Sequence, residues 1–185
     1  METFHQILKF LDTNIILSLF PLLLSILLIE LIFKNRFKTK QVINLVRWII
    51  IGYTMLSFLF FLTGIIVSSK EFSFVNRATG PYWWAYWIML FGATVFPFSL
   101  LYKKLGSKPI YILLVIFLMK IGFYFERFVI ITTSFHRDYD PDNNNFDGLS
   151  IFVKGLLILL LQGFIMAIVL LTFFELLERF KTKNN

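Results

Sequence analysis

The chain has 185 residues, of which 58% are hydrophobic and 16% charged, whereas an ordinary soluble domain carries about 25% charged residues. This composition excludes a water-soluble globular fold and indicates an integral membrane protein. The absence of cysteine excludes disulfides, thiolate metal sites and cysteine nucleophiles. The two histidines, His5 and His136, stand near the ends of different segments, so we expect no haem held within the chain.

Five apolar runs predict the architecture, because each approaches or exceeds the roughly 20 residues that a helix needs to cross a bilayer. Lipid offers no hydrogen-bond partners to a backbone, so the spans are expected to be helices. With no internal repeat or linker, residues 1–185 are predicted to form one domain, an all-α bundle of five transmembrane helices. The predicted spans are residues 15–33, 48–67, 82–101, 109–133 and 151–174.

The charges of the connecting links predict the orientation of the chain. The links after the first and third spans and the C-terminal tail are basic, whereas the links after the second and fourth spans are mixed or acidic. The positive-inside rule then places the N-terminus outside, in the periplasm, and the C-terminus in the cytoplasm. The net charge of +7 is explained by these links, and no nucleic-acid partner is expected. The cations concerned are Lys34, Arg36, Lys38, Lys40, Arg47, Lys103, Lys104, Lys108, Arg179, Lys181 and Lys183.

Several residues predict local boundaries within these spans. Pro109 is expected to start the fourth helix, where its missing N–H matters least. Asp12 and Ser150 precede the first and fifth spans as candidate N-caps. Pro21 and Pro97 lie inside spans, so each is expected to kink its helix.

The fourth span carries three ionisable residues, Lys120, Glu126 and Arg127. At about 1.5 Å per residue, Lys120 falls near mid-depth and the other two about 25 Å along the span. An ionisable group at membrane depth is a functional candidate by default, so one interpretation is a polar pocket or proton path. The other is that Lys120 and Arg127 snorkel or form a buried pair that fixes helix packing. Glu30 and Gln162 are available as partners from other spans.

The tryptophans Trp83, Trp84 and Trp87 cluster at the predicted outer start of the third span. Amphipathic rings favour the headgroup level, so an aromatic belt is the simplest interpretation. A surface that stacks against a quinone ring or a neighbouring subunit is the alternative.

The predicted outer loop holds Asp138, Asp140 and Asp142, which match the first three ligand positions of a calcium-binding loop. The match ends there, because Asn143 and Leu149 stand where such a loop has Gly and Glu. A solvated acidic loop is the stronger interpretation, and the chain offers no other metal candidate.

His136, followed by Arg137 and Asp138, has acid–base potential, because a histidine titrates near neutrality. A surface or capping histidine is the alternative. We assign no catalytic residue to this chain.

Three segments resemble a known family: Asn76–Trp87 (NRATGPYWWAYW), Ile121–Ile131 (IGFYFERFVII) and Thr133–Tyr139 (TSFHRDY). They resemble the NrfD/PsrC-type membrane subunits, closest to those of alternative complex III, a bacterial quinol:electron-acceptor oxidoreductase. Family members have about twice as many helices in two bundles, and this chain resembles only the second, C-terminal half. The acidic run that follows Asp138 departs from the family pattern.

The resemblance implies a multi-pass subunit of the bacterial inner membrane, working in a respiratory or redox complex beside other membrane subunits and iron–sulfur or multihaem subunits. It implies that a quinone could bind nearby, with no cofactor held by this chain and no catalysis by this chain alone. It also places Glu126, Arg127, His136, Arg137 and Asp138 on a proton path. Two other functions remain open: a non-catalytic structural or assembly subunit, and a small carrier that acts as a dimer.

Overall fold

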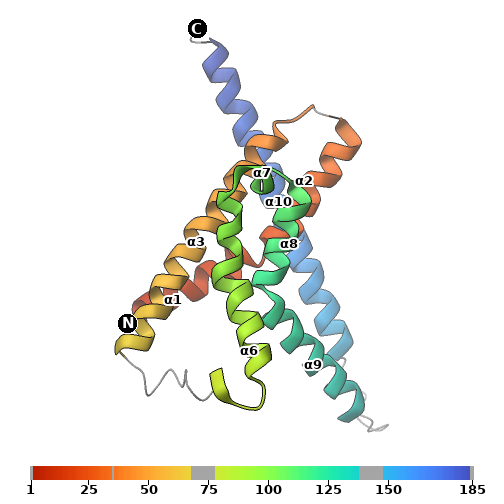
Figure 1. Ribbon diagram of the computed structural model, residues 1–185. Helices are drawn as coiled ribbons and strands as arrows, with labels where there is room; N and C mark the ends of the chain where they lie inside the picture. Colours follow the sequence, from red (N-terminus) through yellow and green to blue (C-terminus); the bar gives the residue numbers. More distant parts are fainter. Residues whose placement is uncertain (1, 35, 68–77, 138–147, 184–185) are drawn as a thin grey trace.

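The computed structural model describes residues 2–34, 36–67, 78–137 and 148–183, and every regular element within these ranges is helical (Figure 1). Helices α1 (Glu2–Leu11) and α2 (Leu19–Phe33) are separated by a π-helical segment, η1 (Asp12–Ile16). Helix α3 covers Thr39–Val67. The later elements are α6 (Trp83–Leu90), the π-helical η2 (Phe91–Val95), the 3-10 helix η3 (Phe96–Leu101), α7 (Lys103–Gly106), α8 (Pro109–Met119), α9 (Ile121–Arg137) and α10 (Gly148–Lys183).

Within the described ranges, four helical segments are long and apolar enough to cross a membrane: Gln6–Phe33, Thr39–Ile66, Trp83–Leu101 and Val153–Thr182. The prediction of an all-helical chain with membrane-spanning segments is therefore confirmed at this level. The predicted span 109–133 is not one continuous helix. The backbone of Lys120 leaves the helical conformation (φ −107°, ψ 11°) and divides it into α8 and α9.

The helix boundaries differ from the predicted ones. An apolar run shows which residues lipid can cover, but a helix can continue beyond that run into polar residues. Helix α3 begins at Thr39, so Arg47, predicted to lie in a link, is inside a helix. Asp12 follows α1 and therefore cannot cap the first helix, and Ser150 lies inside α10. Pro109 is the first residue of α8, as predicted.

The basic links lie together at one end of the molecule. In Figure 1 the α2–α3 connection, α7 and the end of α10 are at the top, whereas the ends of α3 and α9 and the start of α6 are at the bottom. This grouping agrees with the charge alternation on which the predicted orientation depends. We call the top the basic end and the bottom the far end.

The hydrophobic core lies toward the basic end, around α2. Helix α2 packs against α10, α8 and α3, and Leu19, Leu22, Leu23 and Ile26 are fully buried there. The approach of α10 is close: a Cβ added at Gly163 would lie 2.6 Å from the backbone nitrogen of Leu22. Small residues allow such contacts between membrane helices, which have no water-driven hydrophobic force to bring them together.

The helices diverge toward the far end (Figure 1). On α3 half of the residues from 55 to 66 are exposed, with Met55 at 58% and Ile66 at 80%. On α9, Phe125 and Phe128 are 63% and 65% exposed. This half of the molecule therefore leaves apolar side chains for lipid or another protein to cover.

Regular α-helix is interrupted just before both predicted kink sites. Pro21 has no N–H to donate to the carbonyl of Leu17. The irregular segment η1 and the turn that follows it come just before Pro21 in the chain. Pro97 likewise has no N–H for the carbonyl of Ala93, which lies in the π-helical segment η2. Irregular helix is thus found beside both prolines, and the kinks expected there stay a prediction.

Candidate functional site

Lys120 lies in the break between α8 and α9, with its side chain only 10% exposed. The backbone N–H of Lys120 donates to the carbonyl of Phe117 at 3.1 Å, which tightens the last turn of α8. The first turn of α9 then forms, with the backbone N–H of Tyr124 donating to the carbonyl of Lys120 at 3.0 Å. The backbone has therefore departed from regular helix at the same residue that places a positive charge inside the bundle.

The partner of Lys120 is Asp12, which opens η1 at the break between α1 and α2. One carboxylate oxygen, Asp12 Oδ1, forms an ion pair with Lys120 Nζ. The hydroxyl of Tyr53 on α3 donates to the same oxygen at 2.6 Å. A buried lysine with a hydrogen-bonded carboxylate satisfies the requirement that charges removed from water be paired.

This polar site lies near the middle of the bundle. Counted from the basic end at about 1.5 Å per residue, Lys120 is about 16 Å along α8 and Tyr53 about 21 Å along α3. The hydrocarbon core of a bilayer is about 30 Å thick, so both counts place the site near mid-depth. We call Asp12, Tyr53 and Lys120 the mid-depth site.

Helix α10 supports the irregular backbone beside this site. Gln162 Nε2 donates to the carbonyl of Asn14 in η1 at 2.8 Å. The hydroxyl of Ser18 lies 2.8 Å from the carbonyl of Ile15 and 3.3 Å from the sulfur of Met166. Gln162 thus joins α10 to a carbonyl of the π-helical turn, where backbone hydrogen bonding is irregular. Gln162, proposed from sequence as a partner for the charges of the fourth span, is instead bonded to η1.

A second buried cation, Arg47, lies at the basic end of the core. Arg47 on α3 is 7% exposed, and its Nε donates to the carbonyl of Leu100 at 2.8 Å. Its Nη2 lies 3.4 Å from the carbonyl of Leu101. These are carbonyls at the end of η3, where a helix has no backbone donors left to offer. Arg47 therefore acts as a side-chain cap that joins α3 to η3.

An exposed ion pair lies further out at the basic end. Lys38 Nζ is 2.8 Å from Glu178 Oε2, with both side chains more than 40% exposed. The hydrogen bond with Glu178 raises the pKa of Lys38 above its ordinary value. Because water screens this pair, it contributes little to stability.

The other charges proposed from sequence lie apart from the mid-depth site. Glu126 and Arg127 are exposed on α9, and the guanidinium of Arg127 lies 5.1 Å from the ring centre of Phe123. His136 and Arg137 belong to the end of α9, but their side chains are outside the described residues. Asp138, Asp140 and Asp142 are also outside the described residues, so the weak calcium candidate stays a prediction.

The tryptophans Trp83, Trp84 and Trp87 are exposed on α6. Trp87 Nε1 donates to the carbonyl of Ala78 at 3.3 Å. Both an aromatic belt and a docking surface agree with this exposure, so the two interpretations remain open.

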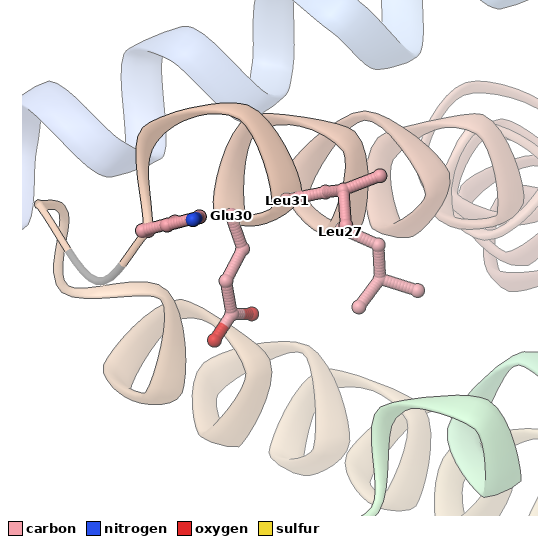
Figure 2. Close-up of a pocket in the computed structure, with 4 residues that line it drawn as sticks. Leu27, Glu30 and Leu31 are labelled. Atoms are coloured by element: carbon pink, nitrogen blue, oxygen red, sulfur yellow. The ribbon is translucent and has the colours of Figure 1, made fainter.

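Figure 2 shows a shallow hollow on α2, lined by Leu27, Glu30, Leu31 and Lys34, in which Glu30 points toward α3. It is open to the surroundings and lacks the convergent polar groups of a ligand site. Within the ranges that the structure describes, no group of three or more His, Cys, Asp or Glu residues is arranged to hold a metal ion.

Asp12 and Tyr53 are the members of the mid-depth site that sequence reasoning missed. The predicted first span begins at Ile15, so Asp12 is expected to be a flanking cap. The available signal was that helix-forming apolar residues precede Asp12 as well as follow it, in the segment Gln6–Phe33. A lone acid inside such a segment marks a charge that needs a partner.

No protein-family model, curated protein or solved structure matches this chain.

Proposed function

We propose that this chain is a membrane subunit of a bacterial redox complex in which the mid-depth site carries one step of a proton path. The observation that carries the proposal is the Asp12–Lys120 ion pair at the point where two spans lose regular helical structure. Charges inside a membrane are expensive and are retained mainly where ions or protons move. Broken helices at mid-depth are the usual framework of such sites.

The chemistry follows from the three side chains. A proton that binds Asp12 removes the charge with which Lys120 is paired, so proton arrival and release of the ammonium are coupled. The hydroxyl of Tyr53, at 2.6 Å from Asp12, can both accept and donate a proton. Asp12 is 38% exposed and Lys120 10%, so Asp12 is the group that a proton donor reaches first.

The wider assignment depends on the resemblance to NrfD/PsrC-type subunits in the segments Asn76–Trp87, Ile121–Ile131 and Thr133–Tyr139. We propose five spans, with α8 and α9 together as a broken fourth span, the basic end in the cytoplasm and the far end in the periplasm of a bacterial inner membrane. Partners are other membrane subunits and iron–sulfur or multihaem subunits, with a quinone nearby and no cofactor held by this chain.

A structural role is the second candidate. Within the described part of the chain, every buried side-chain nitrogen and oxygen has a hydrogen-bond partner. Because all of its buried polar atoms are paired, the mid-depth site is also explained by a purely structural role, which is to fix the packing of α1, α3 and the α8–α9 junction.

The two candidate functions predict different results when Asp12 and Lys120 are both replaced by apolar residues. The double variant Asp12→Leu/Lys120→Met removes both charges, which a packing role tolerates and a proton path does not. We expect the variant to assemble in native membranes and to lose proton-coupled turnover of the complex, measured by quinol oxidation and acidification of the medium. Lys38→Gln, at the exposed pair, is the matched control and should retain full turnover.

Full turnover of an assembled double variant would support the structural role and exclude the proton path. Mass spectrometry of what co-purifies with the chain in mild detergent tests the wider assignment. Recovery with iron–sulfur or multihaem subunits supports it, whereas recovery without any redox subunit contradicts it.

A further inference from the structure

Helix α9 carries two opposite charges on an exposed surface. Glu126 and Arg127 are both exposed, and within the described ranges neither forms an ion pair. In those ranges α9 packs mainly against α8, from which it continues. The other described segments therefore leave this pair of charges uncovered.

The side chain of Arg127 is directed toward the start of α9 and away from the far end. A helical side chain leans toward the N-terminus of its helix, and α9 starts at mid-depth beside Lys120. Arg127 follows this rule, since its guanidinium lies 5.1 Å from the ring centre of Phe123, one turn closer to mid-depth. Snorkelling to the far end would require Arg127 to leave that ring. The charges are thus placed to meet another protein surface within the membrane.

We propose that α9 docks against α9 of a second copy of this chain, with Glu126 of each copy paired with Arg127 of the other. Two copies with the same orientation in a membrane place equal residue numbers at equal depth. A twofold axis along the membrane normal then brings residue 126 of one copy to 127 of the other, and the reverse. The two positions differ by only about 1.5 Å in height, so both ion pairs form together.

A second copy fits this surface better than an unrelated subunit for a reason of charge. An unrelated subunit would have to present both a base and an acid at the matching depth. The same chain supplies them automatically, and the reciprocal pairs neutralise all four charges. This inference requires α9 to lie in the membrane but is independent of the proton path and of the redox assignment.

The strip of α9 that would form the contact is defined by helical spacing. Phe123 and position 130 lie on the same strip as Glu126 and Arg127, whereas Phe128, 65% exposed, lies on the opposite side of the helix. Because the chain contains no cysteine, a single introduced cysteine reports one contact only.

The experiment is disulfide cross-linking of the full chain in native membranes. We expect Ile130→Cys to form a homodimeric cross-link at least about tenfold more efficiently than the control Phe128→Cys. In the Ile130→Cys background, Glu126→Arg alone and Arg127→Glu alone should each lower the yield about tenfold, because like charges then face one another. Co-expression of the two should restore it as a heterodimer with both ion pairs complementary.

Equal yields at positions 128 and 130 would overturn the proposal. So would a mixture of the two charge variants that cross-links no better than either alone, or a cross-link from position 130 to a different protein only. The co-expression step distinguishes loss of contact from misfolding, because two misfolded chains would not restore each other.

Discussion

Lys120 and Asp12 are 108 positions apart in the sequence, and each lies where a helix is interrupted. The ion pair between them joins the α8–α9 junction to the α1–η1 junction, and Tyr53 connects it to α3. One charge pair thus joins two places where backbone hydrogen bonding is irregular.

We predict an asymmetry between removing one member of this pair and removing both. Asp12→Leu leaves the ammonium of Lys120, only 10% exposed, without its partner and should lower the free energy of unfolding by about 3–5 kcal/mol. Lys120→Met should cost less, because the carboxylate of Asp12 is 38% exposed and keeps its hydrogen bond from Tyr53. The double variant should lose far less, because it leaves no charge without a partner. Thermal and denaturant unfolding of the purified protein in detergent measure this. Lys38→Gln is the control for simple loss of a cation. If the loss in the double variant equals the sum of the two single losses, Asp12 and Lys120 are not energetically coupled.

Tyr53→Phe tests the hydrogen bond to the carboxylate while keeping the ring. Since bonds to charged groups contribute about 1.5–3 kcal/mol, we expect a loss of that order in unfolding free energy. In the Asp12→Leu background the same change should have almost no effect, which a double-mutant cycle measures. Tyr111→Phe, which removes a bond to the neutral hydroxyl of Ser99 (2.7 Å), is the control and should cost less. A Tyr53→Phe effect independent of Asp12 would show that the ring and not the hydroxyl contributes.

Gly163 and Gly155 in α10 should respond in opposite directions to alanine. A Cβ at Gly163 would lie 2.6 Å from the nitrogen of Leu22 and 2.7 Å from Cβ of Pro21, whereas a Cβ at Gly155 has nothing within 4 Å. Gly163→Ala should therefore separate α2 from α10 and destabilise the protein by about 1–3 kcal/mol. Gly155→Ala should be neutral or stabilising by up to about 1 kcal/mol, because alanine favours helix. Paired melting curves decide this, and equal effects would mean that α2 and α10 do not approach as described.

Arg47 should be needed for the cap on η3. Arg47→Met keeps much of the apolar stem but leaves the buried carbonyl of Leu100 without its 2.8 Å donor, a loss of about 1–3 kcal/mol. Lys40→Met removes an exposed cation of the same helix and should change little. Unfolding measurements of both variants compare them directly. If they are equally stable, Arg47 is not acting as a cap.

Local patterns were sufficient for several features of the fold. The apolar runs indicated long membrane helices, Pro109 marked the start of α8, and Pro21 and Pro97 marked irregular helix. Each depends only on residues close in the chain: hydropathy over about 20 positions, or the missing N–H of one proline. The presence of a buried cation at Lys120 was predictable for the same reason, since the depth of a residue follows from counting along one helix.

The partners of the buried cations were not predictable from such patterns. Glu30 and Gln162 were considered for the charges of the fourth span, but Lys120 pairs with Asp12. Arg47 was assigned to a link, but it caps η3. Both errors arose because hydropathy treats a charge near the end of an apolar run as a boundary, although another segment can supply its partner inside the bundle.

The sequence by itself determined that this protein is helical and suited to a membrane, where its basic links lie along the chain, and which residue places a charge near mid-depth. Only the tertiary structure decided that Asp12 and Tyr53 meet that charge and that α8 and α9 are separate helices. The physical reason is that an interrupted helix in a membrane persists only if other segments satisfy its free polar groups. Gln162 bonds to a carbonyl of η1, and its position depends on how α10 packs against α2.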